Sequence, residues 1–227
     1  MSIVRSAVYD PQGLARIAYA GDLVATNEVV PAANSGTAVT LTGALLSLGI
    51  YLSSAGSAPT LTLDSAANIV ASLAPQFGYN QNAAVPAGTP NYTAIPNGTS
   101  FRFRYIQSTA FAATIAATAN TGVTVNRGSV AASTSRDFLI TVSNGTPVQT
   151  VSVNSTSGSA TLSGFSQAQL ANLSIGMIVT NAALNLQGQT ITSINVAAGT
   201  VTMSGNANAT AVGTSLTFSP VIVVDGL

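Results

Sequence analysis

The chain has 227 residues, of which 47% are hydrophobic and only 5% are charged, and its mean hydropathy is +0.45. Six arginines balance six acidic residues, and Lys, His and Cys are absent, which excludes a basic nucleic-acid surface, disulfides and thiolate metal sites. So few charges give an isolated monomer little of the surface that keeps proteins soluble. We therefore expect neighbouring subunits to cover much of the surface; a secreted polar β protein is the alternative.

Residues 1–30 are expected to form an N-terminal arm that embraces a neighbouring subunit, or else a frayed terminus. They hold five of the twelve charged residues, and Arg5 and Arg16 among these are candidate partner contacts. The segment contains no apolar run of signal-peptide length, so we expect no export through the secretory route. The cytoplasm is then the expected place of synthesis.

Residues 31–149 are predicted to form a β-sandwich, jelly-roll-like in class, because short runs alternate polar and apolar residues between turn signals. The turn signals are Asn97-Gly98 and Asn144-Gly145. The most apolar stretch, Ala44–Leu52, is about half the length of a membrane span, so we expect no membrane insertion. The clearest strands here are Thr37–Thr42, Leu45–Leu52, Phe101–Ile106 and Asp137–Ser143.

One helix is predicted directly after Asp64 and Ser65, either of which can cap it. Its apolar residues Ile69, Val70 and Leu73 fall at helical spacing, and Pro75 ends it. The polar, Pro- and Gly-rich stretch that follows, from 75 to 98, is predicted to be a long exposed loop.

The sharpest local pattern is Phe101-Arg102-Phe103-Arg104-Tyr105. Alternation in a strand places the three aromatic rings on one face, toward a core, and Arg102 and Arg104 on the other. The two arginines are either a solvated sheet face or a row of contacts to a partner subunit, with a substrate role as a third reading. We select Arg102 and Arg104 as candidate partner contacts.

A boundary is predicted near residues 146–150, after which aromatic residues nearly vanish. Residues 150–219 are therefore predicted to form a small second β unit, with one short helix over Ser166–Leu173. Residues 220–227 form an apolar strand, and if it returns to pair with the first domain, the second unit is an insertion. The strands expected in the second unit are Thr190–Val196, Thr200–Ser204 and Ser215–Phe218.

The residue types present argue against catalysis and bound cofactors. Nucleophilic triads and most general bases need His, Cys or Lys near a hydroxyl, and the chain has none of these. The six acidic residues are scattered along the sequence, without the spacing of a calcium loop or an evident carboxylate pair. We therefore expect no enzymatic activity, no metal and no cofactor.

Five sequence runs within residues 173–218 resemble a small β module that is common in virion proteins of tailed bacteriophages. They are Leu173–Val179, Gly188–Ile194, Gly199–Ser204, Ala207–Thr210 and Leu216–Phe218.

The upstream part is similar to phage capsid decoration, or cement, proteins. That likeness lies in the short helix from Asp64 to Leu73 and in Gly98–Phe103, Thr121–Val125 and Arg136–Val142. The resemblance implies a jelly-roll-like fold without catalysis and a homotrimer seated on the major capsid protein, at the capsid surface of the virion. The same module occurs in tail and fibre proteins, so a fibre or spike component that binds a host glycan is the alternative. Decoration is favoured because the chain has no Trp and only 6% aromatic residues, whereas sugar clefts are usually lined by aromatic side chains.

Overall fold

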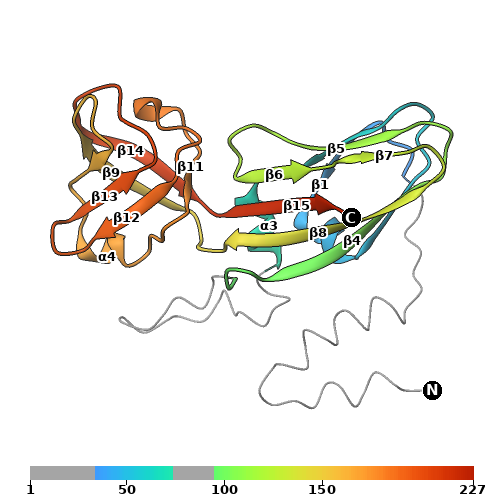
Figure 1. Cartoon of the computed structure of the whole chain (residues 1–227), viewed down its shortest axis with the longest axis horizontal. Helices are drawn as coiled ribbons and strands as arrows, with labels where there is room; N and C mark the ends of the chain where they lie inside the picture. The colour runs from blue at the N-terminus through green and yellow to red at the C-terminus, as the bar shows by residue number, and fades with distance from the viewer. Residues whose placement is uncertain (1–33, 74–94) are drawn as a thin grey trace, which may run out of the picture.

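A computed structural model describes residues 34–73 and 95–227 and shows two β lobes end to end (Figure 1). Residues 34–73, 95–146 and 220–227 build the first lobe, and residues 147–219 build the second. The described residues form four sheets and three short α-helices joined by turns and loops, so the predicted all-β sandwich is confirmed. The N-terminal arm and most of the loop predicted over 75–98 lie outside the described residues.

The first lobe packs a five-stranded sheet against a four-stranded sheet. The five-stranded sheet has the order β2 (Ile50–Ser53), β4 (Ser100–Gln107), β8 (Ser135–Asn144), β15 (Val221–Gly226) and β6 (Val123–Asn126). The four-stranded sheet has the order β1 (Ala38–Leu41), β3 (Thr60–Leu63), β5 (Ala113–Ala117) and β7 (Ser129–Val130). Parallel pairing joins β1 to β3, β3 to β5, β2 to β4 and β15 to β6, so the chain repeatedly crosses from one sheet to the other.

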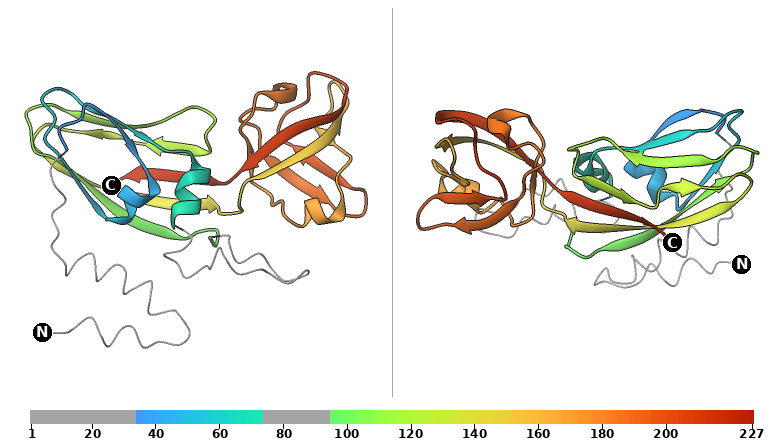
Figure 2. Two further views of the ribbon diagram at one scale, coloured as in Figure 1. Left: turned by 180° about the vertical axis from the view of Figure 1, so that it is seen from behind. Right: turned by 45° about the horizontal axis from the view of Figure 1, so that its top comes forward.

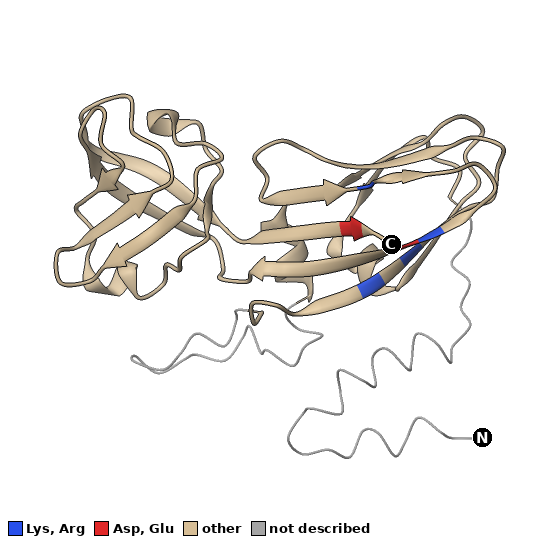
Figure 3. Cartoon of the chain, in the orientation of Figure 1, with Lys and Arg blue, Asp and Glu red and all other residues tan. Residues whose placement is uncertain are grey.

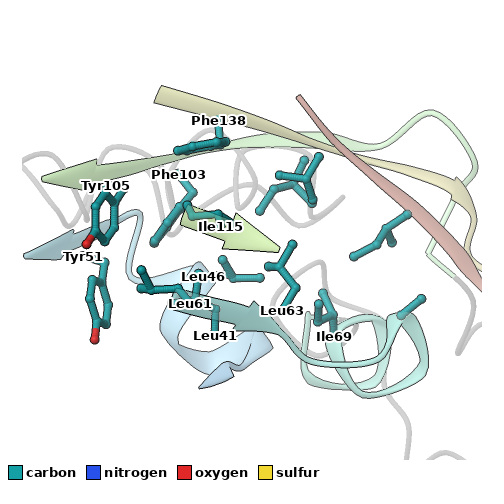
Figure 4. Packing of buried hydrophobic residues seen from close by; sticks show 14 of the residues in the cluster. Leu41, Leu46, Tyr51, Leu61, Leu63, Ile69, Phe103, Tyr105, Ile115 and Phe138 are labelled. Carbon is teal, nitrogen blue, oxygen red and sulfur yellow. The ribbon is translucent and has the colours of Figure 1, made fainter. Parts of the chain in front are cut away.

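One hydrophobic cluster fills the space between these two sheets (Figure 4). Phe103 and Tyr105 on β4 and Phe138 on β8 point into it and are almost fully buried. Tyr51 on β2 stacks on Tyr105 with ring centroids 5.8 Å apart and planes 13° apart. Burial raises the pKa of both tyrosines above the ordinary value, because the charged phenolate is poorly solvated there.

The predicted helix after Asp64 and Ser65 is α3 (Ala66–Leu73). The Ser65 hydroxyl accepts a hydrogen bond from the Asn68 backbone N–H at 3.2 Å, as expected for a helix cap. Asp64 accepts from the Ser65 N–H at 2.7 Å and from the Asn68 side chain at 2.9 Å. Ile69, together with Val70 and Leu73, faces the core, so this prediction is confirmed.

The strand predicted over Leu45–Leu52 is wrong in its first half, which is the helix α2 (Gly43–Ser47). Thr42 starts this helix because its hydroxyl accepts a hydrogen bond from the Leu45 N–H at 3.3 Å. Gly49, with a φ of 75°, ends the helical turn and leads into β2. An apolar run of this length suits a buried helix as well as a strand, and the cap decides between them.

The second lobe has its own hydrophobic cluster, separate from that of the first. Its helix α4 (Gln167–Leu170) begins with a capping box, in which Ser166 and Gln169 bond each other's backbone N–H groups at 3.2 and 2.8 Å. One sheet has the order β11 (Ile178–Val179), β14 (Ala211–Ser219) and β9 (Gln149–Ser155), and the other β10 (Thr161–Leu162), β13 (Thr200–Met203) and β12 (Ile191–Asn195).

Two neighbouring connections join the lobes: the chain leaves the first lobe after β8 and returns through β15, which pairs with β8 (Figures 1 and 2).

The tight turn predicted at Asn144-Gly145 is wrong, because these residues form the outward connection. The buried Asn144 side chain donates hydrogen bonds to the Ser174 hydroxyl at 2.8 Å and the Ile175 carbonyl at 2.9 Å. Its Oδ1 accepts from the Thr146 N–H at 2.9 Å. Gly145 passes so close to a neighbouring chain segment that an added Cβ would lie 1.9 Å from the Ile95 carbonyl oxygen.

Candidate interaction face on the five-stranded sheet

The outer face of the five-stranded sheet carries the arginines that the sequence singled out. The strand predicted over Phe101–Ile106 is β4, with Phe103 and Tyr105 buried toward the core. Arg102 and Arg104 point the opposite way and are exposed, as predicted. Strand alternation alone therefore places both guanidinium groups on one accessible face.

Arg104 forms a bidentate ion pair with Asp137, its direct neighbour on β8. Arg104 Nε lies 2.6 Å from Asp137 Oδ1, and Nη2 lies 2.9 Å from Oδ2. These hydrogen bonds hold the pKa of the Asp137 carboxyl below its usual range and raise the pKa of Arg104. The Arg104 side chain is 53% exposed, so solvent screens the pair and its contribution to stability is modest.

Arg102 lies in the adjacent row of the same face. Within residues 34–73 and 95–227 its guanidinium makes no hydrogen bond, although its charge helps to lower the pKa of Asp137. Its neighbours across the sheet are Leu139 on β8 and then Asp225 on β15. Asp225 accepts a hydrogen bond from the Asn126 side chain at 2.8 Å. The row therefore presents a guanidinium, an apolar side chain and a carboxylate.

Half-buried apolar side chains surround these charges on the outer face. The register places Ile50 beside Arg104 and Leu52 beside Ile106, and the alternation on β15 turns Val223 to the same side. These side chains are neither fully covered nor fully exposed. A face of mixed apolar and charged groups is suited to binding another protein surface, because partial exposure of apolar atoms favours contact and the charges fix its register.

Arg136 has a structural role that the sequence did not suggest. Its guanidinium donates to the Ser129 carbonyl at 2.6 Å and to the Leu227 carbonyl at 3.3 Å. It also lies 6.0 Å from the centre of the Phe138 ring. These contacts tie the end of β15 to β7 and β8. Alternation along β8 is the signal that separates Arg136 from its outward-facing neighbour Asp137.

The remaining candidate contacts are Arg5 and Arg16, and the remaining kinds of site to consider are a metal site and a membrane-spanning helix. Arg5 and Arg16 lie outside the described residues. In the ranges 34–73 and 95–227, no group of three or more acidic side chains is arranged to hold a metal ion. None of the described helices is long and apolar enough to cross a membrane.

A shallow groove of about 400 Å³ runs between α3 and the two connections to the second lobe. Its lining includes Ala67, Asn68, Pro147, Val148 and Pro220. None of these side chains ionises, so the lining offers apolar contact and one amide rather than acid–base chemistry.

The second lobe carries no formal charge. No Asp, Glu, Lys or Arg occurs between residues 138 and 224, and in Figure 3 the ribbon positions coloured as charged residues all lie in the first lobe. Its surface is built from Ser, Thr, Asn, Gln and scattered apolar residues, among them the exposed Ile175, Val196 and Val212. Contacts made by this lobe would involve neutral hydrogen bonds and apolar burial, without the cost of desolvating ions.

Comparison of the chain with protein-family models, with curated proteins and with solved structures gives no significant match.

Proposed function

We propose that this chain is a structural protein of a tailed-bacteriophage particle, which binds the assembled capsid and strengthens it as a decoration protein. The proposal starts from the sequence resemblance of residues 173–218 to a phage virion module. Those residues supply most of the second lobe, including β11, β12, β13 and β14. The major capsid protein and further copies of this chain are the proposed partners.

The observation that carries the proposal is the separation of charge between the lobes. The first lobe offers Arg102 and Arg104 on an accessible sheet face, whereas the second offers only neutral groups. A surface with so few Lys and Glu side chains loses little rotamer entropy and pays little desolvation cost when neighbours cover it. Such a surface suits a permanent place in a repeating assembly better than a freely diffusing monomer.

Co-sedimentation with empty capsid shells of the encoding phage tests the proposal. The wild-type chain should pellet with the shells and saturate them. The double variant Arg102→Gln/Arg104→Gln should bind about tenfold or more weakly, because hydrogen bonds from arginine to charged or buried acceptors would be lost.

Arg127→Gln is the matched control, since it removes an exposed guanidinium in the turn that follows β6. Its binding should equal that of the wild type. A wild-type chain that stays in the supernatant at every concentration would refute the proposal. Localisation of the chain at the tail tip in density of the intact particle would instead support the glycan-binding alternative.

A further inference from the structure

One row of the outer sheet face carries opposite charges on the two sides of an apolar residue. Arg102 on β4 lies opposite Leu139 on β8, and Leu139 lies opposite Asp225 on β15. Neighbouring strands are ~4.8 Å apart, so the backbones at Arg102 and Asp225 are about 10 Å apart, with Leu139 between them. The row therefore places a positive, an apolar and a negative side chain (Arg102, Leu139 and Asp225) on three adjacent strands.

We propose that two copies of this chain pack face to face through this sheet, about a two-fold axis that runs along β8 at Leu139. Such an axis exchanges the β4 side of one copy with the β15 side of the other. Arg102 of each copy then meets Asp225 of the other, and the two Leu139 side chains meet at the axis. Packed sheets lie ~10 Å apart, a distance that an extended Arg and an Asp span together.

The neighbouring row is compatible with this packing. Asp137, two residues before Leu139 on β8, would come near Asp137 of the second copy. Arg104 binds both oxygens of this carboxylate, so the like charges are already neutralised within each copy. The contact would also cover Ile50 and Val223, whose side chains are half-exposed in the single chain.

Charge complementarity selects a second copy as the occupant of this face. Two arginines and two aspartates make the face neutral as a whole, so a strongly acidic or basic partner would gain little from it. The two-fold arrangement instead places Arg102 of each copy opposite Asp225 of the other.

The contact should be weak and depend on concentration. Strand spacing and length give the face about 500 Å², below the ~800 Å² that each partner usually contributes to a stable interface. Self-association through this face requires no capsid, and because the same arginines cannot contact a shell while two copies are packed through them, shell binding would compete with the dimer.

Charge exchange tests the two-fold contact, with the dimer dissociation constant measured by analytical ultracentrifugation. Arg102→Glu places a carboxylate opposite Asp225, and Asp225→Arg places a guanidinium opposite Arg102. Each single variant thus replaces two attractive pairs by two repulsive pairs, and its dissociation constant should rise about tenfold or more. The double variant Arg102→Glu/Asp225→Arg should restore the wild-type value.

An equimolar mixture of the two single variants should also form dimers, because both contacts of the mixed pair then join opposite charges. Dimerisation of the mixture shows that the two charges interact between copies. If Arg102 and Asp225 interacted within one chain instead, the double variant would restore the dimer and the mixture would not. Thr114→Glu/Gln167→Glu is the control for net charge. It lowers the net charge by two units, as Arg102→Glu does, at exposed positions on β5 and next to α4's N-cap, and it should dimerise normally.

Three outcomes would overturn the two-fold contact, provided that circular dichroism shows each variant to be folded. They are a wild-type chain that stays monomeric at millimolar concentration, single variants that fail to associate on mixing while the double variant dimerises, and a trimer whose mass neither single variant changes. The last outcome would favour the three-fold assembly implied by the phage resemblance. A monomeric chain that still pellets with capsid shells would refute the dimer and leave the proposed function standing.

Discussion

Asn144 is predicted to fix the two lobes to each other, and Asn144→Ala tests this directly. Its amide reaches Ser174 and Ile175 in the second lobe, and its carbonyl oxygen accepts from Thr146 in the connection. The Ser174 hydroxyl keeps a second partner in the substituted protein, the Thr146 hydroxyl 2.6 Å away. The Ile175 carbonyl and the Thr146 N–H lose their side-chain partner.

The loss of stability follows from these two groups, the Ile175 carbonyl and the Thr146 N–H, which are left without a side-chain partner. A polar group left without its hydrogen bond costs about 1–3 kcal/mol when it is buried. These two are partly buried, so we expect the free energy of unfolding to fall by about 2–4 kcal/mol in total. Asn172→Ala is the matched control, because that exposed amide makes one bond, to the Ala168 carbonyl, and its loss should cost under ~1 kcal/mol.

Urea unfolding followed by two signals measures both the cost and the coupling of the lobes. The chain has no Trp, and none of its six tyrosines lies in residues 147–219, so tyrosine fluorescence does not report on the second lobe. Circular dichroism reports on both lobes. The two transitions should coincide in the wild type and separate in Asn144→Ala. A variant as stable as the Asn172 control, with coincident transitions, would refute the role of Asn144.

Three further predictions concern the lobes and the ionisable groups. Replacing residues 150–219 by a Gly/Ser linker should leave a remainder that unfolds cooperatively in urea at a lower midpoint; loss of all cooperativity would show one shared core. Arg104→Gln should raise the Asp137 pKa measured by NMR. The stability difference from wild type should stay within about 1 kcal/mol above pH 4 and vanish as the pH falls through the lowered pKa, because the pair needs the carboxylate; an unchanged pKa would contradict the pairing. Stability should also fall above pH ~10, where Tyr51 and Tyr105 ionise in the unfolded chain before they do so in the folded one; a flat alkaline profile would contradict their burial.

Local patterns in the sequence predicted much of the first lobe. The alternation of aromatic and arginine residues predicted both faces of β4, and the serine and aspartate before Ala66 predicted where α3 begins. The same kind of reasoning failed at Leu45–Leu52, where an apolar run is compatible with either a helix or a strand. It also failed at Asn144-Gly145, because the dipeptide favours a tight turn only when two strands of one hairpin flank it.

The candidate face depends on pairings that the sequence pattern does not reveal. Arg104 meets Asp137 across 33 residues of chain. Asp225 joins the same face only because β15 returns beside β8 after the whole second lobe. Alternation fixes which side of a strand a residue occupies, whereas strand order depends on long-range packing. Arg102 and Arg104 were therefore predictable as outward-facing residues, and their neighbours were not.

The pairing of β8 with β15 also determines how the protein would respond to mechanical force. Both ends of the described chain, at Asn34 and Leu227, belong to the first lobe, and the second lobe lies between two strands that are hydrogen-bonded to each other. Tension applied between these ends would first load the strand pairs of the first lobe. Tension would reach residues 147–219 only after β15 had separated from β8. The second lobe is thus mechanically shielded, and a pulling experiment should record its extension as the later event.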